Sequence, residues 1–270
     1  FLFFLLITSC TKDKTKLDQM LDEQDIEEEM IVAYKEGMDA LKEGDGLFAS
    51  KKFDEAELLF PQSPWAAKSS LMSAFSLYSL DYLDDAIFYL ERHIKNYPKD
   101  KNLDYAHYLI AICYFEQLYD EKKDLNPLLK AKEKFEFIVS TYPDTDYATD
   151  SRFKIDLIID QLAAKEMSIA RFYMKTEKWI AALNRLKVVV DQYDRTIFVE
   201  EALHRLAEVY YRLGLVDEAK KAASILGYNY GSGQWYERTY KVFNKKYKLR
   251  KIKKEKEMGL IRRKIKSLFE

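Results

Sequence analysis

The chain has 270 residues, of which 48% are hydrophobic and 33% are charged, so it can bury a large core and still present a charged surface. With 8 Gly, 5 Pro and 2 Cys it is neither a low-complexity chain nor a disulfide scaffold. The formal net charge of −1 hides two opposite blocks, because residues 1–60 sum to −8 and residues 241–270 sum to +10. Such blocks are typical of tails and docking faces.

The first ten residues, FLFFLLITSC, form a short apolar run followed by small polar residues and a cysteine. The run is too short to span a bilayer, and it resembles the end of a secretory signal whose start is truncated. Residues 7–10 resemble a bacterial lipobox, which predicts that Cys10 carries lipid. Thr11 follows it, and in similar lipoproteins a residue other than Asp at that position favours export to the outer membrane. The alternative is an ordinary signal peptide with an incidental cysteine.

A recurring spacing dominates the rest of the chain. A small residue is followed by alanine twelve positions later in Gly44/Ala56, Ala74/Ala86, Ala170/Ala182 and Ala207/Ala219, and Ala111/Ala131 fits with eight inserted residues. This spacing is typical of the tetratricopeptide repeat, a helical hairpin of about 34 residues whose helices cross at the small residues. The sequence therefore predicts an all-α, right-handed solenoid of five helix–turn–helix repeats, about ten helices in all.

The predicted organisation follows from these repeats. Residues 1–10 are the signal end with its lipobox, 11–28 an acidic tether, 29–144 repeats 1–3, 145–240 repeats 4–5, and 241–270 a basic amphipathic tail that extends the helices. In repeat one we expect a long first helix over residues 31–51 and a short second helix over 53–60. Repeat four should begin with a long helix over residues 147–175. Gly214 and Gly227 are placed where helices should stop.

The chain offers little that could perform chemistry. His93, His107 and His204 lie on separate predicted helices without ligand spacing, and there is no HExxH, CxxC, phosphate loop or GxSxG elbow. Cys113 lies in an apolar helix and should be a buried small hydrophobe. We therefore expect no enzyme activity, no metal and no cofactor other than lipid on Cys10.

The tail from residue 241 is the most strongly charged feature. Its apolar residues lie roughly on one helical face: Leu249, Ile252, Met258, Ile261, Ile265 and Leu268. A basic amphipathic helix can lie on anionic lipid or meet an acidic partner, and the alternative is a solvated extension without a partner. Nucleic acid is not expected as a partner, because an exported protein rarely meets it.

From residue 61 to about residue 240 the chain resembles the BamD family, lipoproteins of the complex that assembles β-barrel proteins into the outer membrane of Gram-negative bacteria. The segments that carry the resemblance are FPQSPWAAKSSLMSAFSLY, DYAHYLIAICYFEQ, YPDTDYATDSRFKIDLIIDQLAAKEMSIARFYM, WIAALNRLKVVV, VEEALHRLAEVYYRLGLVDEA and ILGYNY. The pairing of LAAKEM…ARFYM with AALNR is specific beyond general repeat similarity.

The resemblance implies a role. It implies a lipid anchor at the periplasmic face of the outer membrane, where the chain acts as a scaffold and client receptor of the barrel-assembly (BAM) complex. N-terminal repeats in such proteins are thought to receive the C-terminal strand of unfolded barrel proteins, and C-terminal repeats dock on periplasmic domains of the barrel subunit BamA. The arginine of the AALNR segment, Arg185, lies at that docking contact in similar proteins. Other BAM lipoproteins are further possible partners.

A groove that holds an extended client strand should be lined by first helices of the N-terminal repeats. The candidate lining residues are Tyr34, Ser73, Leu77, Tyr78, Tyr108 and Tyr114. The competing reading is another envelope lipoprotein with these repeats, such as a glycan-binding or cell-division scaffold. Two departures from the family stand out: the short second helix of repeat one, and a basic tail that runs past the family's usual end and could replace contacts of an accessory lipoprotein.

Overall fold

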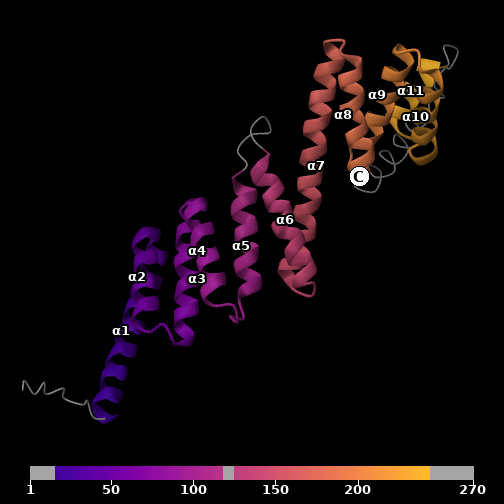
Figure 1. The fold of residues 1–270 in the computed structure, drawn as a ribbon. Coiled ribbons are helices and arrows are strands. Elements are labelled where there is room, and N and C mark those ends of the chain that lie inside the picture. Colours follow the sequence, from indigo (N-terminus) through magenta and orange to yellow (C-terminus); the bar gives the residue numbers. More distant parts are fainter. Residues whose placement is uncertain (1–15, 118–124, 244–270) are drawn as a thin grey trace, which may run out of the picture. The chain divides into compact units, whose positions relative to one another are not determined.

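The computed structural model describes residues 16–117 and 125–243, and within these ranges it is entirely helical (Figure 1). The all-α fold of stacked helices is thus confirmed, with eleven helices in the described ranges. They are α1 (Lys16–Glu43), α2 (Gly46–Leu59), α3 (Pro64–Tyr78), α4 (Leu83–Asn96), α5 (Leu103–Glu116), α6 (Asn126–Thr141), α7 (Asp146–Lys175), α8 (Trp179–Gln192), α9 (Val199–Arg212), α10 (Val216–Asn229) and α11 (Gln234–Phe243).

The chain divides into two compact units, Phe1–Ile158 and Ile159–Glu270, and α7 contributes residues to both. In unit 1, α1 packs on α2, α3 on α4 and α5 on α6, and consecutive pairs join through α2–α3 and α4–α5. In unit 2, α8 packs on α9, α9 on α10, and α11 on both α9 and α10. Each helix buries one face against its neighbours, so the units are stabilised by stacking of hairpins.

The turns inside four hairpins share one geometry. The residue two places before the second helix has a positive φ, namely Gly44 (86°), Asp81 (63°), Glu177 (59°) and Gly214 (79°). In each turn the next N–H donates to the carbonyl five residues back, as Leu215 N–H does to Tyr210 at 2.9 Å. This left-handed cap ends the first helix and satisfies its last carbonyls. Gly214 therefore ends α9 as predicted.

Repeat one has the same hairpin geometry, but its helix crossing lies seven residues before the predicted position. Ala49 is the fourth residue of α2, just as Ala86 and Ala182 are the fourth residues of α4 and α8. Twelve positions before Ala49 lies Gly37, where a Cβ atom would come within 3.0 Å of the Phe53 ring. The close crossing of repeat one is thus Gly37/Ala49, and the predicted pair Gly44/Ala56 was wrong.

The predicted short second helix of repeat one was wrong for the same reason. Gly44 is the turn residue, and the Asp45 side chain caps α2 by accepting a hydrogen bond from Phe48 N–H at 3.0 Å. Helix α2 therefore has 14 residues, as α4, α8 and α10 do. The small residues of the other four predicted pairs are at most 1% exposed, as a close crossing requires.

Two further expectations are corrected. The structure is helical from Lys16 instead of beginning near residue 29, so most of the expected tether 11–28 extends α1; a segment without Gly or Pro has no helix breaker. Gly227 lies inside α10 and does not end it. A Cβ atom there would lie 2.9 Å from the Tyr236 ring, so Gly227 permits close packing of α11. The long helix predicted from residue 147 is confirmed as α7.

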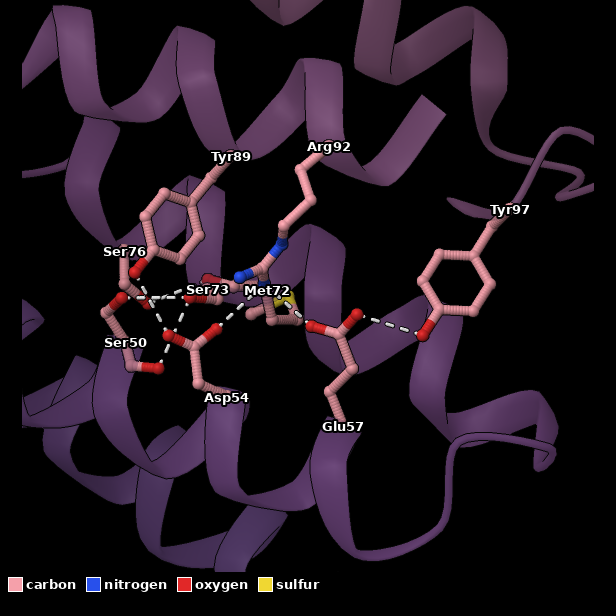
Figure 2. A network of polar contacts seen from close by, with 9 residues as sticks. All are labelled: Ser50, Asp54, Glu57, Met72, Ser73, Ser76, Tyr89, Arg92 and Tyr97. Carbon is pink, nitrogen blue, oxygen red and sulfur yellow. Dashed lines mark hydrogen bonds and ion pairs between the residues drawn. The ribbon is translucent and has the colours of Figure 1, made fainter. Parts of the chain in front are cut away.

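A polar network joins the second helices of repeats one and two (Figure 2). From α4, Arg92 donates to Asp54 at 3.0 Å and to Glu57 at 2.7 Å of α2. Tyr89 donates to Asp54, and Tyr97 donates to Glu57 at 2.9 Å. Because Glu57 is only 8% exposed, these charge-assisted bonds fix α4 against α2.

Candidate functional site

Three of the six predicted groove residues belong to the core of unit 1. Ser73 is fully buried, and its hydroxyl lies 2.9 Å from the Ser50 hydroxyl. Leu77 is 6% exposed within the cluster that joins α3 to α5. Tyr34 is 8% exposed and meets the Trp65 ring edge-on at 5.2 Å. Ser73 and Leu77 therefore cannot line a surface, whereas Tyr34 supports a residue that does.

The other three predicted residues are half-buried tyrosines. Burial, and then a hydrogen bond from its hydroxyl to Glu116, raises the pKa of Tyr78 to about 12. Burial and a 2.6 Å bond to Asp150 likewise raise the pKa of Tyr108. The Lys130 ammonium lies 5.2 Å from the centre of the Tyr114 ring. At neutral pH the hydroxyls of Tyr78 and Tyr108 are thus proton donors engaged within the unit.

The structure places a groove beside these residues, where α3, the loop before α5 and the start of α7 meet. Two adjoining cavities of about 670 and 400 Å³ share Lys68, Lys101 and Asn102, and we call them together the client groove, after the client strand that the sequence analysis expects in this unit. Its lining comprises Pro64, Trp65, Ala67, Lys68, Leu71, Met72, Lys99, Asp100, Lys101, Asn102, Asp104, Tyr105 and Tyr147. All of these residues lie in unit 1.

Aromatic rings form the walls of the client groove. The Lys68 ammonium lies 4.9 Å from the Trp65 ring centre and 5.1 Å from that of Tyr34. Tyr147 lies against both Tyr105, at 5.6 Å between ring centres, and Tyr108, at 5.0 Å. Aromatic faces of this kind pack well against apolar side chains of a ligand. Tyr34 and Tyr108 thus stand behind the rings that line the groove.

In the client groove the carboxylates have polar partners, whereas the lysines form no ion pairs within the described residues. Asp100 lies 3.3 Å from His93, and Asp104 accepts from the Tyr105 N–H at 2.8 Å. Within the described residues, no carboxylate forms an ion pair with Lys68, Lys99 or Lys101. The groove therefore offers ammonium groups beside aromatic rings, which suits a ligand with both anionic and apolar parts.

Sequence reasoning missed the residues that line the groove because its candidates came from the middle and the C-terminal ends of the helices. The lining comes from the first three turns of α3, the first turn of α5, the start of α7 and the loop between α4 and α5. A usable signal was present: Trp65, Lys68 and Met72 follow helical spacing directly after Pro64, which opens α3.

Arg185, the predicted docking residue, lies in unit 2. Its Nη1 donates to both carboxylate oxygens of Glu166, at 3.2 and 3.3 Å, and its side chain remains 43% exposed. This pair joins two of the segments that carry the family resemblance, LAAKEM on α7 and AALNR on α8. An exposed, single-nitrogen contact leaves the other guanidinium donors for a partner.

Arg171 shows the opposite arrangement. Its Nε and Nη2 bind both oxygens of Glu201, which also accepts from Arg205. Burial alone would raise the pKa of Glu201, but the hydrogen bonds from Arg171 and Arg205 outweigh it and lower that pKa. The Glu201 side chain is only 10% exposed, so this cluster holds α7 to α9.

No group of three or more His, Cys, Asp or Glu in the described part of the chain could hold a metal ion. Burial lowers the pKa of His93, and His204 sits in the core with its Nδ1 at 2.7 Å from the Thr239 hydroxyl. Cys113 is fully buried, which raises the pKa of its thiol to about 12. Among the described helices, none combines the length and apolarity that crossing a membrane needs. Cys10 and the tail beyond residue 243 lie outside the described residues.

Comparison with known proteins identifies the family. The model of the YfiO family, described as outer membrane lipoproteins, matches residues 26–225. This chain belongs to that family. It is 37% identical over 238 residues to the outer membrane protein assembly factor BamD of Caulobacter vibrioides, covering 88% of this chain and 77% of that one. It is 38% identical over 221 residues to BamD of Rickettsia prowazekii, covering 82% and 88%.

The resemblance to the BamD family seen in the sequence is thereby confirmed. A further relative, BamD of Neisseria meningitidis serogroup A, is 31% identical over 210 residues and covers 73% of this chain. The matched residues include both the client groove and the Arg185–Glu166 pair. The chain is accordingly a member of a family of outer membrane proteins whose relatives serve as assembly factors.

Proposed function

We propose that this chain is the lipid-anchored scaffold and client receptor of a barrel-assembly complex in the outer membrane. The match to BamD assembly factors over most of the chain carries this proposal. The chain performs no covalent chemistry in this role; it binds clients in unit 1 and a barrel subunit through unit 2. Its only attached group is lipid on Cys10.

The client groove binds an extended strand of an unfolded barrel protein. Such strands alternate aromatic or apolar residues with polar ones, so one row of side chains packs on Trp65 and Tyr147. Lys68 and Lys101 pair with anionic groups, including the terminal carboxylate of a C-terminal strand. Because exposed ion pairs contribute little and a factor that hands clients onward must release them, the complex is weak and dissociates quickly.

Arg185 docks the chain on a BamA-like subunit. Its guanidinium is half exposed and bound only through Nη1 to Glu166, so a partner carboxylate can take a bidentate contact without breaking the fold. Glu166 orients Arg185 before docking, which reduces the side-chain entropy lost on binding. Contacts with other lipoproteins of the complex would add to this docking.

The anchor is lipid on Cys10 at the periplasmic face of the outer membrane. Two or more acyl chains hold a protein durably at a bilayer, whereas one holds it weakly. Labelling with a palmitate analogue should mark the chain, and Cys10→Ser should abolish the label. A label that persists in Cys10→Ser would refute the anchor.

Photo-crosslinking tests client binding. Benzoylphenylalanine is placed at Trp65 in the groove or, as the control, at Phe88, an exposed residue of α4 that does not line it. Unfolded barrel proteins should crosslink at position 65 and not at position 88. Equal crosslinking at both would remove the groove from the proposal.

Recovery of the complex tests docking. A tagged chain purified in detergent should bring with it a large barrel protein bearing periplasmic domains, and Arg185→Glu should lose that protein. The matched control is Arg195→Glu, another arginine of unit 2. Recovery of no barrel protein by the unmodified chain would favour an envelope scaffold of another kind.

A further inference from the structure

A groove lies between α10 and α11, the last two described helices of unit 2. Four residues of each helix line it, and both sets follow the spacing of one helical face. They are Lys220, Ala223, Ser224 and Gly227 on α10, and Tyr236, Thr239, Tyr240 and Phe243 on α11. The groove encloses about 410 Å³ and, among these residues, contains no carboxylate.

This groove is the position that the next helix of the array would take. Earlier in the chain, α4 packs on α3, the first helix of its own hairpin, and reaches back to α2 through Tyr89 and Arg92 (Figure 2). Like α2, α10 is the second helix of its hairpin; α11 follows it and packs on α10, as α3 packs on α2, and more extensively on α9. A helix along both α10 and α11 would repeat the relation of α4 to α2 and α3.

The sequence after α11 fits that position. Residues 244–270 provide 27 residues, and a turn of two to four residues followed by a 14-residue helix, as in the other hairpins, needs fewer. Met258, Ile261, Ile265 and Leu268 are spaced by three, four and three residues, which places them on one helical face. The same segment carries twelve Lys or Arg residues and three Glu.

The last helix of such an array must show an apolar face inward and a polar face outward, because no further repeat covers it. The groove presents aromatic rings and small residues, and Lys220 is the one charged residue of its lining, so it favours the apolar face of the segment and repels the basic residues, which stay in solvent. We propose that residues 244–270 dock as a helix in the α10/α11 groove and complete a sixth hairpin. The segment that follows α11 then covers the groove that α10 and α11 leave open.

Hydrogen–deuterium exchange on the full chain tests this docking. Two variants should release the segment: Ile261→Ser with Ile265→Ser, which removes its apolar face, and Ser224→Trp, which fills the groove from an exposed position. The matched controls are Arg262→Ser with Lys266→Ser, and Lys221→Trp on the exposed side of α10. Amides of residues 255–268 should exchange about tenfold faster in the first two variants and within about twofold of the unmodified chain in the controls.

The amides of α8 and α9 report whether unit 2 stays folded and should not change. Equally fast exchange of residues 255–268 in the unmodified chain and both releasing variants would overturn the proposal. Protection that appears only when phosphatidylglycerol vesicles are added would also overturn it, because lipid would then be the occupant. If Ile261→Ser with Ile265→Ser fails to fold, faster exchange of residues 255–268 in Ser224→Trp alone is enough to support the proposal.

Discussion

The two units are built from the same hairpin, yet they use their cationic side chains differently. In unit 1, Lys68, Lys99 and Lys101 surround an aromatic groove and pair with no carboxylate of the described chain. In the described part of unit 2, Arg171 and Arg205 are committed to Glu201, whereas Arg185 is half engaged. The comparison teaches that one hairpin scaffold can hold some cationic groups in buried ion pairs and leave others, beside aromatic rings or half exposed, able to contact a ligand.

The hairpin crossings of both units should be equally intolerant of larger side chains. Ala86→Leu in unit 1 and Ala182→Leu in unit 2 insert three carbons into fully buried sites, so each should cost about 2–3 kcal/mol of stability in its own unit. Exposed controls, Glu91→Leu and Asn184→Leu, should change it by less than about 0.5 kcal/mol. Hydrogen exchange resolved by unit is the measurement. Loss of protection in neither unit would contradict the crossings.

The two arginines of unit 2 should separate stability from docking. Arg171→Ala leaves the buried Glu201 with one partner and should lower the free energy of unfolding by about 1–2 kcal/mol. Arg185→Ala removes an exposed pair and should lower it by less than about 1 kcal/mol. Urea unfolding of the two variants measures the difference. Equal losses would show that Arg185 is structural.

The lysines of the client groove should contribute to client affinity and not to the stability of the fold. Lys68→Glu with Lys101→Glu should weaken binding of a fluorescent C-terminal strand peptide about tenfold, by replacing attraction with repulsion. The control, Lys95→Glu with Lys42→Glu, changes the same number of exposed lysines outside the groove. Fluorescence anisotropy is the measurement, and matching affinities of the two double variants would contradict a role for the groove.

Unit 2 should lose stability in acid through Glu201. Because its pKa is lower in the folded protein than its ordinary value of 4.5, its contribution is complete above that value and is lost as the pH falls through the lowered one. Glu201→Gln should therefore be less stable than the unmodified chain at neutral pH, with a smaller further loss in acid. The measurement is the free energy of unfolding of both proteins from neutral pH to below the lowered pKa of Glu201. Parallel pH profiles of Glu201→Gln and the unmodified chain would contradict a contribution from this carboxylate.

The smallest expected effect concerns the turns. Glu177→Gly should raise stability by about 0.5–1 kcal/mol, because glycine accepts a φ of 59° without strain. The reciprocal change, Gly214→Glu, should lower it by about 1 kcal/mol through the backbone alone, since a Cβ atom there meets nothing within 4 Å. Thermal unfolding of both variants is sufficient, and shifts of the same sign would contradict the shared turn geometry.

The hairpins were predictable because small residues and apolar periodicity report packing directly. The register of repeat one was predicted wrongly because Gly44 lies twelve residues before Ala56, as a crossing glycine would, although it forms a left-handed turn. The sequence alone does not distinguish a glycine at a helix crossing from a glycine in a turn. The groove lining was less predictable, because Lys99 and Lys101 lie in a loop whose position depends on how α4 and α5 pack. None of the six predicted residues lines the groove, and Tyr34 and Tyr108 only contact two of the rings that do, Trp65 and Tyr147.

Client binding and partner docking should be separate properties of the two units. The decisive measurement compares both on three proteins: the unmodified chain, Lys68→Glu with Lys101→Glu, and Arg185→Glu. Peptide affinity should fall only in the lysine variant, and recovery of the barrel subunit should fall only in the arginine variant. A single variant that loses both while remaining folded, or two variants that lose neither, would contradict the account.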